Sequence, residues 1–477
     1  MYQEAALALA LAAEDHEGWP QVARDRLRAL ATAAIRYAAA CARRNGALDD
    51  YYPYEQAVGA TAFALRACVE AASLLRLRDP ACFAWFKKAA GWLARHRESG
   101  RLANHLALVA LCLHRVGRLL DDASLLAASR ERLHELLQWQ SHEGWFAEYE
   151  GCDPGYHTVT IAFLADLWHA TRDPVLFEAL RRAVRFALAV QHPDGTVGGS
   201  YGSRNSSHAY THGFERLAHH LVDARLFLAQ LHRALRHELQ VPMDDDRLCA
   251  HYAVDYALAY RDAAAFVESA SSAMSNHWFP EAGIVTRTVG NHWLISRLTK
   301  AGAFRLYRDG TLHTSDAGLV VELDDGTVLA SAAGTVDRAE LRDEHAELEG
   351  WLGQARHPLL SPLKQIAFRA VTLTVARRWP NAIRRLLQKV AITTTRPSRL
   401  RYRRYFEWGP PLKVVDELTW HGPRRVRRVF HATDATFIYV AASNTYDPAA
   451  LLAWHALPEV ARQLNESGRA RIVRIYG

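Results

Sequence analysis

Two pairs of neighbouring residues, Asn104-His105 and Tyr156-His157, have side chains suited to proton transfer. Each pair lies at the start of an apolar segment, where a helix that only packed would use Leu or Val. Removing a proton from the carbon next to a carboxylate requires that an amide, a histidine or an arginine first screen the negative charge. A tyrosine or histidine then takes the proton, and an acid donates one to the leaving oxygen. The two pairs together therefore indicate proton abstraction beside a carboxylate.

Each pair also has a structural explanation when it is taken alone. Asn104 can cap the helix that follows it, which would leave His105 exposed. Tyr156 and His157 can pack a loop as an aromatic pair. The chemical interpretation requires the two pairs to meet, so it depends on the elements that position them.

Helical periodicity runs from Met1 to about Ala273. Apolar residues recur every three or four positions in the segments 22–44, 55–77, 80–96, 104–120, 123–140, 157–171, 175–191, 209–238 and 245–272. Four of these helices end at a glycine suited to a left-handed stop, at Gly46, Gly100, Gly144 and Gly195, in steps of 54, 44 and 51 residues. Such a repeat predicts stacked helical hairpins, in an open solenoid or a ring.

In a closed or nearly closed toroid, the loops after the four glycines would open onto one mouth. They carry polar and aromatic residues: Tyr51, Tyr52, Tyr54, Glu55 and Gln56; Asn104 and His105; Tyr149, Tyr156 and His157; and Tyr201, Arg204, Asn205, His208, Tyr210 and His212. We expect Arg204 to bind a second carboxylate and Tyr201, His208 or Tyr210 to join the proton transfers. The alternative for this fourth loop is a glycine-rich turn with solvated polar residues.

Residues 275–477 have a different character, because strand-length runs alternate with the hairpin signals Asp309-Gly310 and Asp325-Gly326. The sequence therefore predicts an α+β protein of two domains. An incomplete (α/α) toroid spans residues 1–274, and an antiparallel β-sandwich spans residues 275–477. A basic amphipathic helical insertion interrupts the sandwich at about 359–391. We expect it to pack its apolar stripe on its own domain; lying on a membrane is the alternative.

The composition and the motifs limit the classes of partner, metal and cofactor that we expect. Lys and Arg exceed Asp and Glu by 58 to 51, and the excess late in the chain favours polyanions. The Arg-rich runs lack the signals of a nucleic-acid-binding module, so no nucleic acid is expected. Six scattered cysteines without a CxxC pair indicate reduced thiols. No histidine spacing forms a zinc set, and no phosphate- or dinucleotide-binding motif occurs, so neither a metal nor a cofactor is expected.

The N-terminus lacks a basic region before its apolar run, which ends at Glu14-Asp15. Neither a signal peptide nor a membrane span is evident. We therefore expect a cytoplasmic protein, or a periplasmic one if a leader has been removed from the sequence.

The order of domains and the two pairs resemble the heparinase II/III and alginate-lyase group of polysaccharide lyases. In that group an Asn-His at the start of an inner helix precedes a Tyr-His by about one repeat. The resemblance implies that Asn104 neutralises a uronate carboxylate with help from His105, and that Tyr156 is the general base and acid, oriented by His157. The group's His-x-His-x-Asp stretch is absent, and only His292, then His313 with Asp316, lie in that region.

The resulting prediction is a lyase that cleaves a uronic-acid-containing polysaccharide by β-elimination. Residues expected to bind the substrate are Tyr52, Tyr54, Gln56, Tyr149, Tyr201, Asn205, Tyr210 and His292. A uronyl C5-epimerase would use the same proton abstraction. A glycoside hydrolase would need two opposed carboxylates, for which Glu143, Glu148, Glu150, Asp153 and Asp194 are available. A non-catalytic protein that binds acidic glycans is the remaining alternative.

Overall fold

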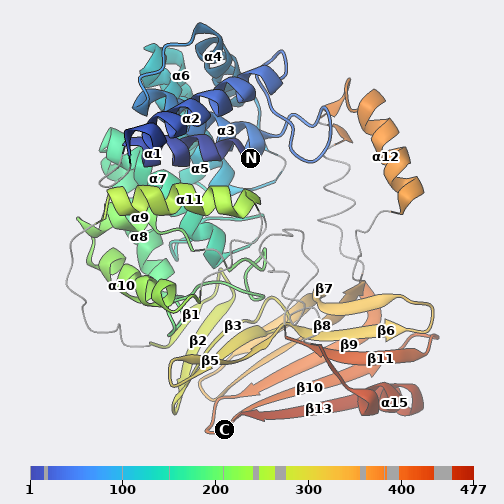
Figure 1. Ribbon diagram of the computed structural model, residues 1–477. Coiled ribbons are helices and arrows are strands. Elements are labelled where there is room, and N and C mark those ends of the chain that lie inside the picture. The colour runs from blue at the N-terminus through green and yellow to red at the C-terminus, as the bar shows by residue number, and fades with distance from the viewer. Residues whose placement is uncertain are drawn as a thin grey trace.

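A helical toroid stands on a pair of β-sheets in the computed structural model (Figure 1). The structure describes residues 2–14, 20–98, 100–149, 151–207, 209–239, 246–263, 275–354, 361–380, 382–383, 397–433 and 454–476. An α/α toroid followed by an antiparallel β-sandwich is the architecture that the sequence predicts, and that prediction is confirmed.

Two layers of helices build the toroid. The inner layer consists of α1 (Ala5–Glu14), α3 (Val58–Leu74), α5 (Ala103–Leu120), α7 (Pro154–Thr171), α9 (His212–Ala218) and α11 (Asp246–Arg261). The outer layer consists of α2 (Gln21–Cys41), α4 (Pro80–Arg95), α6 (Ala123–Leu137), α8 (Pro174–Ala189) and α10 (Val222–Arg236). A short 3₁₀ turn, η1 (Tyr2–Glu4), precedes α1, and α1 packs against both α3 and α11 and so closes the inner ring.

The two layers differ in sequence as their positions require. Inner helices such as α3 and α7 are buried on almost every side, so small and apolar residues fill them. Outer helices such as α8 and α10 bury only one stripe and expose charged residues on the other. The single apolar segment 209–238 forms two helices, because the chain turns between α9 and α10 at His219–His220.

Gly46, Gly144 and Gly195 let the chain approach the next outer helix closely. Gly46, Gly100, Gly144 and Gly195 all have positive φ, between 87° and 107°. A Cβ on Gly195 would lie 2.1 Å from the carbonyl oxygen of Gln230 on α10. The preceding Gln191 donates from Nε2 both to the Gly195 carbonyl (3.1 Å) and to the Phe227 carbonyl of α10 (3.0 Å). Gln140 does the same at Gly144, which explains why glutamine recurs four residues before both glycines.

Gly195→Ala is expected to lower the melting temperature of the protein, with a loss of about 2 kcal/mol or more of stability. The substitution adds both a strained positive φ and a clash with α10. Gly310→Ala is the matched control, because Gly310 has φ +81° and no atom within 4 Å of the added Cβ. Equal losses in the two variants would show that the close approach to α10 does not matter.

Two antiparallel sheets form the C-terminal domain. The smaller sheet has the order β1 (His277–Phe279), β2 (Ile284–Val289), β3 (His292–Arg297), β4 (Ala303–Arg308) and β5 (Thr311–Asp316). The larger sheet has the order β12 (Trp454–Ala456), β11 (Val426–Ala432), β6 (Gly318–Leu323), β7 (Val328–Leu341), β8 (His345–Gln354), β9 (Pro397–Glu407), β10 (Leu412–Trp420) and β13 (Arg469–Tyr476). Helix α15 (Pro458–Ser467) packs on β11 and β13.

The smaller sheet lies between the toroid and the larger sheet. One face contributes Leu294 and Leu306 to a core shared with Leu348 of the larger sheet. The other face contributes Trp293 and Tyr307 to a core shared with Trp145, Phe186 and Tyr201 of the toroid. Strand β3 is therefore buried on both faces, and this second core holds the two domains together.

The helical insertion does not pack as expected. Helix α12 (Pro362–Thr374) lies apart from both sheets, beside the first loop of the toroid (Figure 1). Phe368 contacts Tyr52, but most of the helix surface is exposed, including Leu363 and Ile366. The prediction that its apolar stripe packs on its own domain is therefore wrong for the described part, and residues 384–391 lie outside the described residues. Within the described ranges, no helix is both long and apolar enough to span a bilayer.

Candidate active site

Loops that precede the inner helices meet at one rim of the toroid. The Ala103 amide donates to the Ala147 carbonyl (3.2 Å), which joins the second and third loops. The Ser203 amide donates to the Cys152 carbonyl (2.9 Å), which joins the third and fourth. These backbone bonds bring the start of α5, the start of α7 and Arg204 to the same place.

Glu148 is the hub of this rim. Its Oε1 accepts hydrogen bonds from Asn104 Nδ2 (2.8 Å) and from an Arg204 guanidinium nitrogen (2.6 Å). Asn104 and Glu148 are 0% and 2% exposed, whereas the Arg204 side chain is 11% exposed. Burial raises the pKa of the Glu148 carboxyl, although the Arg204 charge and the Asn104 amide oppose that shift. An amide, a carboxyl and a guanidinium from three repeats thus form one network.

Three buried polar atoms of this network have no hydrogen-bond partner among the described residues: Asn104 Oδ1, Glu148 Oε2 and Arg204 Nε. Buried polar groups are normally paired, so unpaired ones concentrated in one place are typical of a site that receives water or a ligand. Asn104 is buried, and its side-chain amide donates a hydrogen bond to Glu148 rather than to solvent. Arg204 is the member of the network that solvent reaches.

Tyr156 lies directly against Arg204. The guanidinium carbon is 3.8 Å from the centre of the Tyr156 ring and 5.0 Å from that of Tyr149. Asp153 caps α7 by accepting the Tyr156 amide at Oδ1 (3.0 Å), and its Oδ2 accepts the Arg204 amide (2.8 Å). One carboxylate therefore fixes the backbones of both residues. The two side chains also interact electrostatically, because Tyr156 is among the groups that raise the pKa of Arg204.

His105 belongs to the same rim but faces another carboxylate. Its Nδ1 lies 3.1 Å from Glu98 Oε2, and its side chain is 22% exposed. Its ring also lies against the start of α3, where a Cβ on Gly59 would come within 2.6 Å of it. Phe63 packs edge-on against the ring, with 6.0 Å between centroids. His105 is therefore held in place, half-buried, one residue after Asn104.

His157 does not join the site. Its Nε2 lies 3.0 Å from the Ala183 carbonyl of α8, and its ring packs against Phe146 and Phe186. The side chain is 2% exposed, and burial lowers its pKa to about 4. Those contacts place the ring in the interior between α7 and α8, so the expected role of His157 in orienting Tyr156 is not supported.

The buried His157 should make stability depend on pH. The pKa of an exposed histidine is 6.5, and the folded value is about 4, so the unfolded chain binds more protons between these values. Stability should therefore be full above pH 6.5 and fall as the pH drops towards 4, by up to about 3 kcal/mol. His157→Gln should make the melting temperature depend less steeply on pH between 4 and 6.5, whereas replacing the exposed His142 should not. A profile unchanged by His157→Gln would contradict this assignment.

The first loop supplies aromatic residues to the edge of the rim. Tyr52 is 7% exposed and contacts Phe368 of α12, with ring centroids 5.6 Å apart. Tyr54 lies under Arg43, at 4.1 Å, and Gln56 accepts a hydrogen bond from Asn45 (2.9 Å). Both Tyr54 and Gln56 have positive φ, so the loop is tightly turned. Their predicted contact with a substrate stays a prediction.

Several predicted residues of the fourth loop have structural roles instead. Tyr201 is fully buried, and its hydroxyl bonds to His192 Nε2 (2.7 Å), so its predicted contact with a substrate is not supported. Asn205 is 2% exposed, and its side-chain oxygen accepts from Lys300. His208 lies outside the described residues.

The smaller sheet supports the rim through three cations that sequence reasoning missed. Arg297 donates to the Cys152 carbonyl (3.1 Å), Lys300 to the Gly202 carbonyl (2.5 Å) and Arg305 to Ser207 Oγ (3.4 Å). All three lie on or beside β3 and β4 and hold the third and fourth loops. Alternating cations on strands that follow a helical domain would have been the only signal in the sequence.

The histidines of the β-domain have other partners. His292 is 6% exposed, and its ring lies 6.0 Å from that of His313 on the neighbouring part of the sheet. Asp316 is fully buried and pairs with Arg404 (3.2 Å) and His431 (3.1 Å). None of these contacts involves the rim, so the expected binding role of His292 is not supported.

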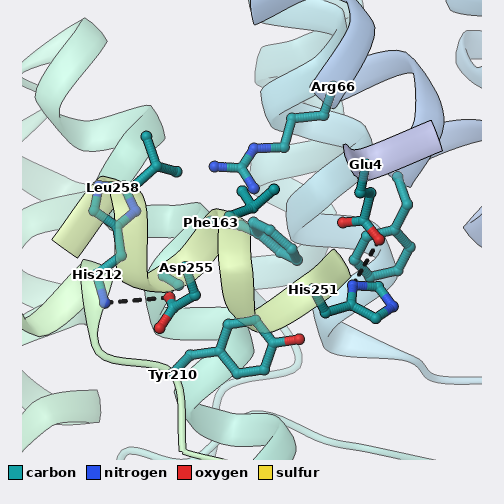
Figure 2. A pocket seen from close by; sticks show the side chains of 11 residues that line it. Glu4, Arg66, Phe163, Tyr210, His212, His251, Asp255 and Leu258 are labelled. Carbon is teal, nitrogen blue, oxygen red and sulfur yellow. Dashed lines mark hydrogen bonds and ion pairs between the residues drawn. The ribbon is translucent and has the colours of Figure 1, made fainter. Parts of the chain in front are cut away.

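Tyr210 connects the rim to a small polar pocket in the centre of the ring (Figure 2). Its ring stacks on Tyr252 (5.7 Å), and its amide donates to Thr158 Oγ1 on α7 (3.0 Å). Burial raises the pKa of Tyr210 well above its usual value. The pocket also contains an ion pair between Glu4 and His251 (2.6 Å), which ties the segment before α1 to α11. Tyr210 therefore lies between this pocket and the N-terminal part of α7, the helix that carries Tyr156.

Apart from Glu148, the described carboxylates that a glycoside hydrolase would need have other structural roles. Glu143 accepts from the Trp145 indole (2.8 Å) and from two backbone amides near Glu281. Asp153 caps α7, and Asp194 accepts from Thr196 in the turn. Glu150 lies outside the described residues. These contacts do not leave two opposed carboxylates facing the rim, as far as the described residues go.

No group of three or more His, Cys, Asp or Glu side chains within the described ranges has the arrangement of a metal site. Four cysteines, Cys68, Cys82, Cys112 and Cys152, are buried and free.

Several solved structures that are similar to this chain are polysaccharide lyases. No protein-family model matches the sequence, and no curated protein matches it either. The chondroitin AC lyase of Streptomyces coelicolor A3, solved with chondroitin sulphate, has a TM-score of 0.52 and 12% identity. The match covers 91% of this chain and 63% of that lyase. The chain has the fold of a chondroitin AC lyase.

Other solved structures with this lyase fold match less closely. Heparinase III gives a TM-score of 0.47 and 11% identity, over 90% of this chain and 72% of that one. The heparinase III product of BT4657 gives 0.41 and 12%, over 80% of this chain and 55% of that one. This chain thus spans only about half to two thirds of the first two lyases it matches. Identities this low show the fold alone, so the activity has to be argued from the site.

Proposed function

We propose that this protein is a polysaccharide lyase that cleaves a uronic-acid-containing polysaccharide by β-elimination. The observation that carries the proposal is the network in which Glu148 joins Asn104 to Arg204 while Arg204 lies over Tyr156. Amide, cation and phenol are the three groups that proton abstraction beside a carboxylate requires. The shared fold with lyases adds support at the level of architecture.

In this proposal Arg204 makes the first contact with the uronate carboxylate, assisted by His105. The approach of a second negative charge raises the pKa of Glu148 further, which favours its protonated form. Protonation of Glu148 would free the charge of Arg204 for the substrate. Asn104 holds Glu148 in place and is available to the carboxylate if that network opens.

Tyr156 then acts on the sugar ring. Its phenolate takes the proton from the carbon next to the carboxylate, and the resulting phenol donates a proton to the oxygen that leaves from the neighbouring carbon. The electron pair of the broken C–H bond forms the new double bond as the C–O bond breaks. The products are an unsaturated uronate at one chain end and a free hydroxyl at the other.

A screen over acidic polysaccharides tests the proposal. Chondroitin sulphate, heparan sulphate, hyaluronan, alginate and polygalacturonate would each be incubated with the protein, with neutral dextran as the control. A rise in near-ultraviolet absorbance would report the unsaturated uronate. Deuterium uptake at C5 without absorbance would instead identify an epimerase. Salt-sensitive retention on acidic glycan without either signal would identify a binding protein.

A further inference from the structure

Helix α12 presents an apolar face to solvent. Leu363, Ile366 and Leu373 are 80%, 66% and 46% exposed, and Ala370 is exposed as well. Their spacing of three, four and three residues puts all four on one side of the helix. Trp379, just beyond the helix, is 60% exposed. Isolated exposed apolar residues are ordinary, but a continuous face of this kind marks an interaction surface.

The opposite side of α12 packs against the first loop of the toroid. Phe368, Thr372 and Ala376 follow one another at intervals of four residues and are the less exposed positions of the segment. Phe368 packs edge-on against Tyr52, and Arg377 lies 5.7 Å from the ring of Tyr54. Because these contacts face the first loop of the toroid, they point the apolar face away from the protein.

Cations flank the apolar face, and acidic residues are missing from the sequence around it. Lys364, Arg369 and Arg378 are exposed. The segment 361–391 contains seven Lys and Arg, and no Asp or Glu occurs anywhere from 350 to 406. An exposed apolar stripe bordered by cations, with an exposed tryptophan, is the pattern of a helix that lies in the interface of an anionic bilayer.

We propose that α12 and Trp379 form an arm that docks the protein on an anionic membrane surface. Leu363 and Ile366 would enter the boundary between headgroups and acyl chains, with the cations against the lipid phosphates and Trp379 at headgroup level. An acidic polysaccharide would match the cations but would gain nothing from exposed leucine and isoleucine. A second copy of the chain would bring its own seven cations against these, and the like charges would repel.

The position of the arm has a consequence for the candidate site. Its inner side rests on Tyr52 and Tyr54, in the loop at the edge of the rim that carries Arg204 and Tyr156. A docked arm would therefore hold that rim near the lipid surface. The docking itself does not depend on the proposed lyase activity.

Co-flotation of the full chain with lipid vesicles tests the arm. We expect binding to vesicles of equal parts phosphatidylglycerol and phosphatidylcholine, loss of binding at high salt, and little binding to phosphatidylcholine alone. The variant Leu363→Asn/Ile366→Asn should bind about tenfold more weakly, as should Lys364→Gln/Arg369→Gln/Arg378→Gln. These positions are exposed, so folding should be unaffected, and equal melting temperatures would verify that.

Matched controls come from the β-sandwich. Val473→Asn/Ile475→Asn removes two apolar side chains that are 46% and 62% exposed, and Arg427→Gln/Arg428→Gln/Arg471→Gln removes three exposed cations. Both should retain vesicle binding. Three results would overturn the proposal: no binding to anionic vesicles, equal losses in the controls, or a dimer that Leu363→Asn/Ile366→Asn dissociates. Retention on heparin that depends on the cations alone would assign the arm to polysaccharide instead.

Discussion

Tyr156→Phe should lower turnover on the responsive polysaccharide by about 10²- to 10⁴-fold, the range for loss of a positioned acid or base. The variant keeps the ring under the Arg204 guanidinium and removes only the hydroxyl. Substrate affinity and melting temperature should therefore stay close to those of the unmodified protein. Initial rates from near-ultraviolet absorbance, together with a direct binding measurement, separate these quantities.

Tyr149→Phe is the matched control for that experiment. Tyr149 also lies near the Arg204 guanidinium, at 5.0 Å, and is mostly buried like its neighbour. We assign it no proton transfer, so its loss should change KM more than kcat. Full activity in Tyr156→Phe, or an equal fall in kcat in both variants, would remove Tyr156 from the proposed role.

Arg204→Leu should remove activity and also destabilise the protein by about 3 kcal/mol, because it leaves the Glu148 carboxylate buried without its cation. Glu148 is 2% exposed and accepts its hydrogen bonds from Arg204 and Asn104 through one oxygen. The double variant Arg204→Leu/Glu148→Gln should recover much of the stability, since no charge then remains to be buried. It should not recover activity, since the substrate still lacks its cation.

That divergence between stability and activity distinguishes catalysis from packing. Thermal melts of the two single variants and the double variant give the coupling between Arg204 and Glu148, and the rates of the same proteins give the catalytic effect. A double variant that regained both stability and activity would show that Arg204 serves only to neutralise Glu148.

Local signals made much of the fold predictable. The helical period and the positive φ of a turn glycine both depend on residues that are close together in the chain. The sequence alone therefore predicts the hairpins of the toroid. The glutamine before two of the glycines was visible as a pattern, although its bonds to the next outer helix were not. The split of segment 209–238 was missed because apolar spacing continues across the turn at His219–His220.

The candidate site was predictable in outline and wrong in detail. Neighbouring residues on a helix point about 100° apart, so a tyrosine in the site does not by itself place the next residue there. That geometry was available from the sequence and explains why His157 bonds to α8 instead. Glu148 was noticed only as a carboxylate for hydrolysis, because its partners lie 44 and 56 residues away in the chain.

The exposed face of α12 shows a different limit. The sequence identified a basic amphipathic segment, and its period is the same whether it packs on its own domain or on something else. The contacts of Phe368 with Tyr52 and of Arg377 with Tyr54 show which side faces the toroid. Orientation is a tertiary property, and the periodic pattern does not contain it.

Because α1 closes the inner ring, the toroid cannot be completed until the last inner helix has been synthesised. Helix α1 is synthesised before the other helices of the toroid, but one of its two flanking partners, α11, ends at Arg261. Until α11 emerges, the apolar surface of α1 has only α3 and its outer neighbours to cover it. The contact between α1 and α11 joins the most distant parts of the domain, so loss of the Glu4–His251 pair should slow the closure of the ring.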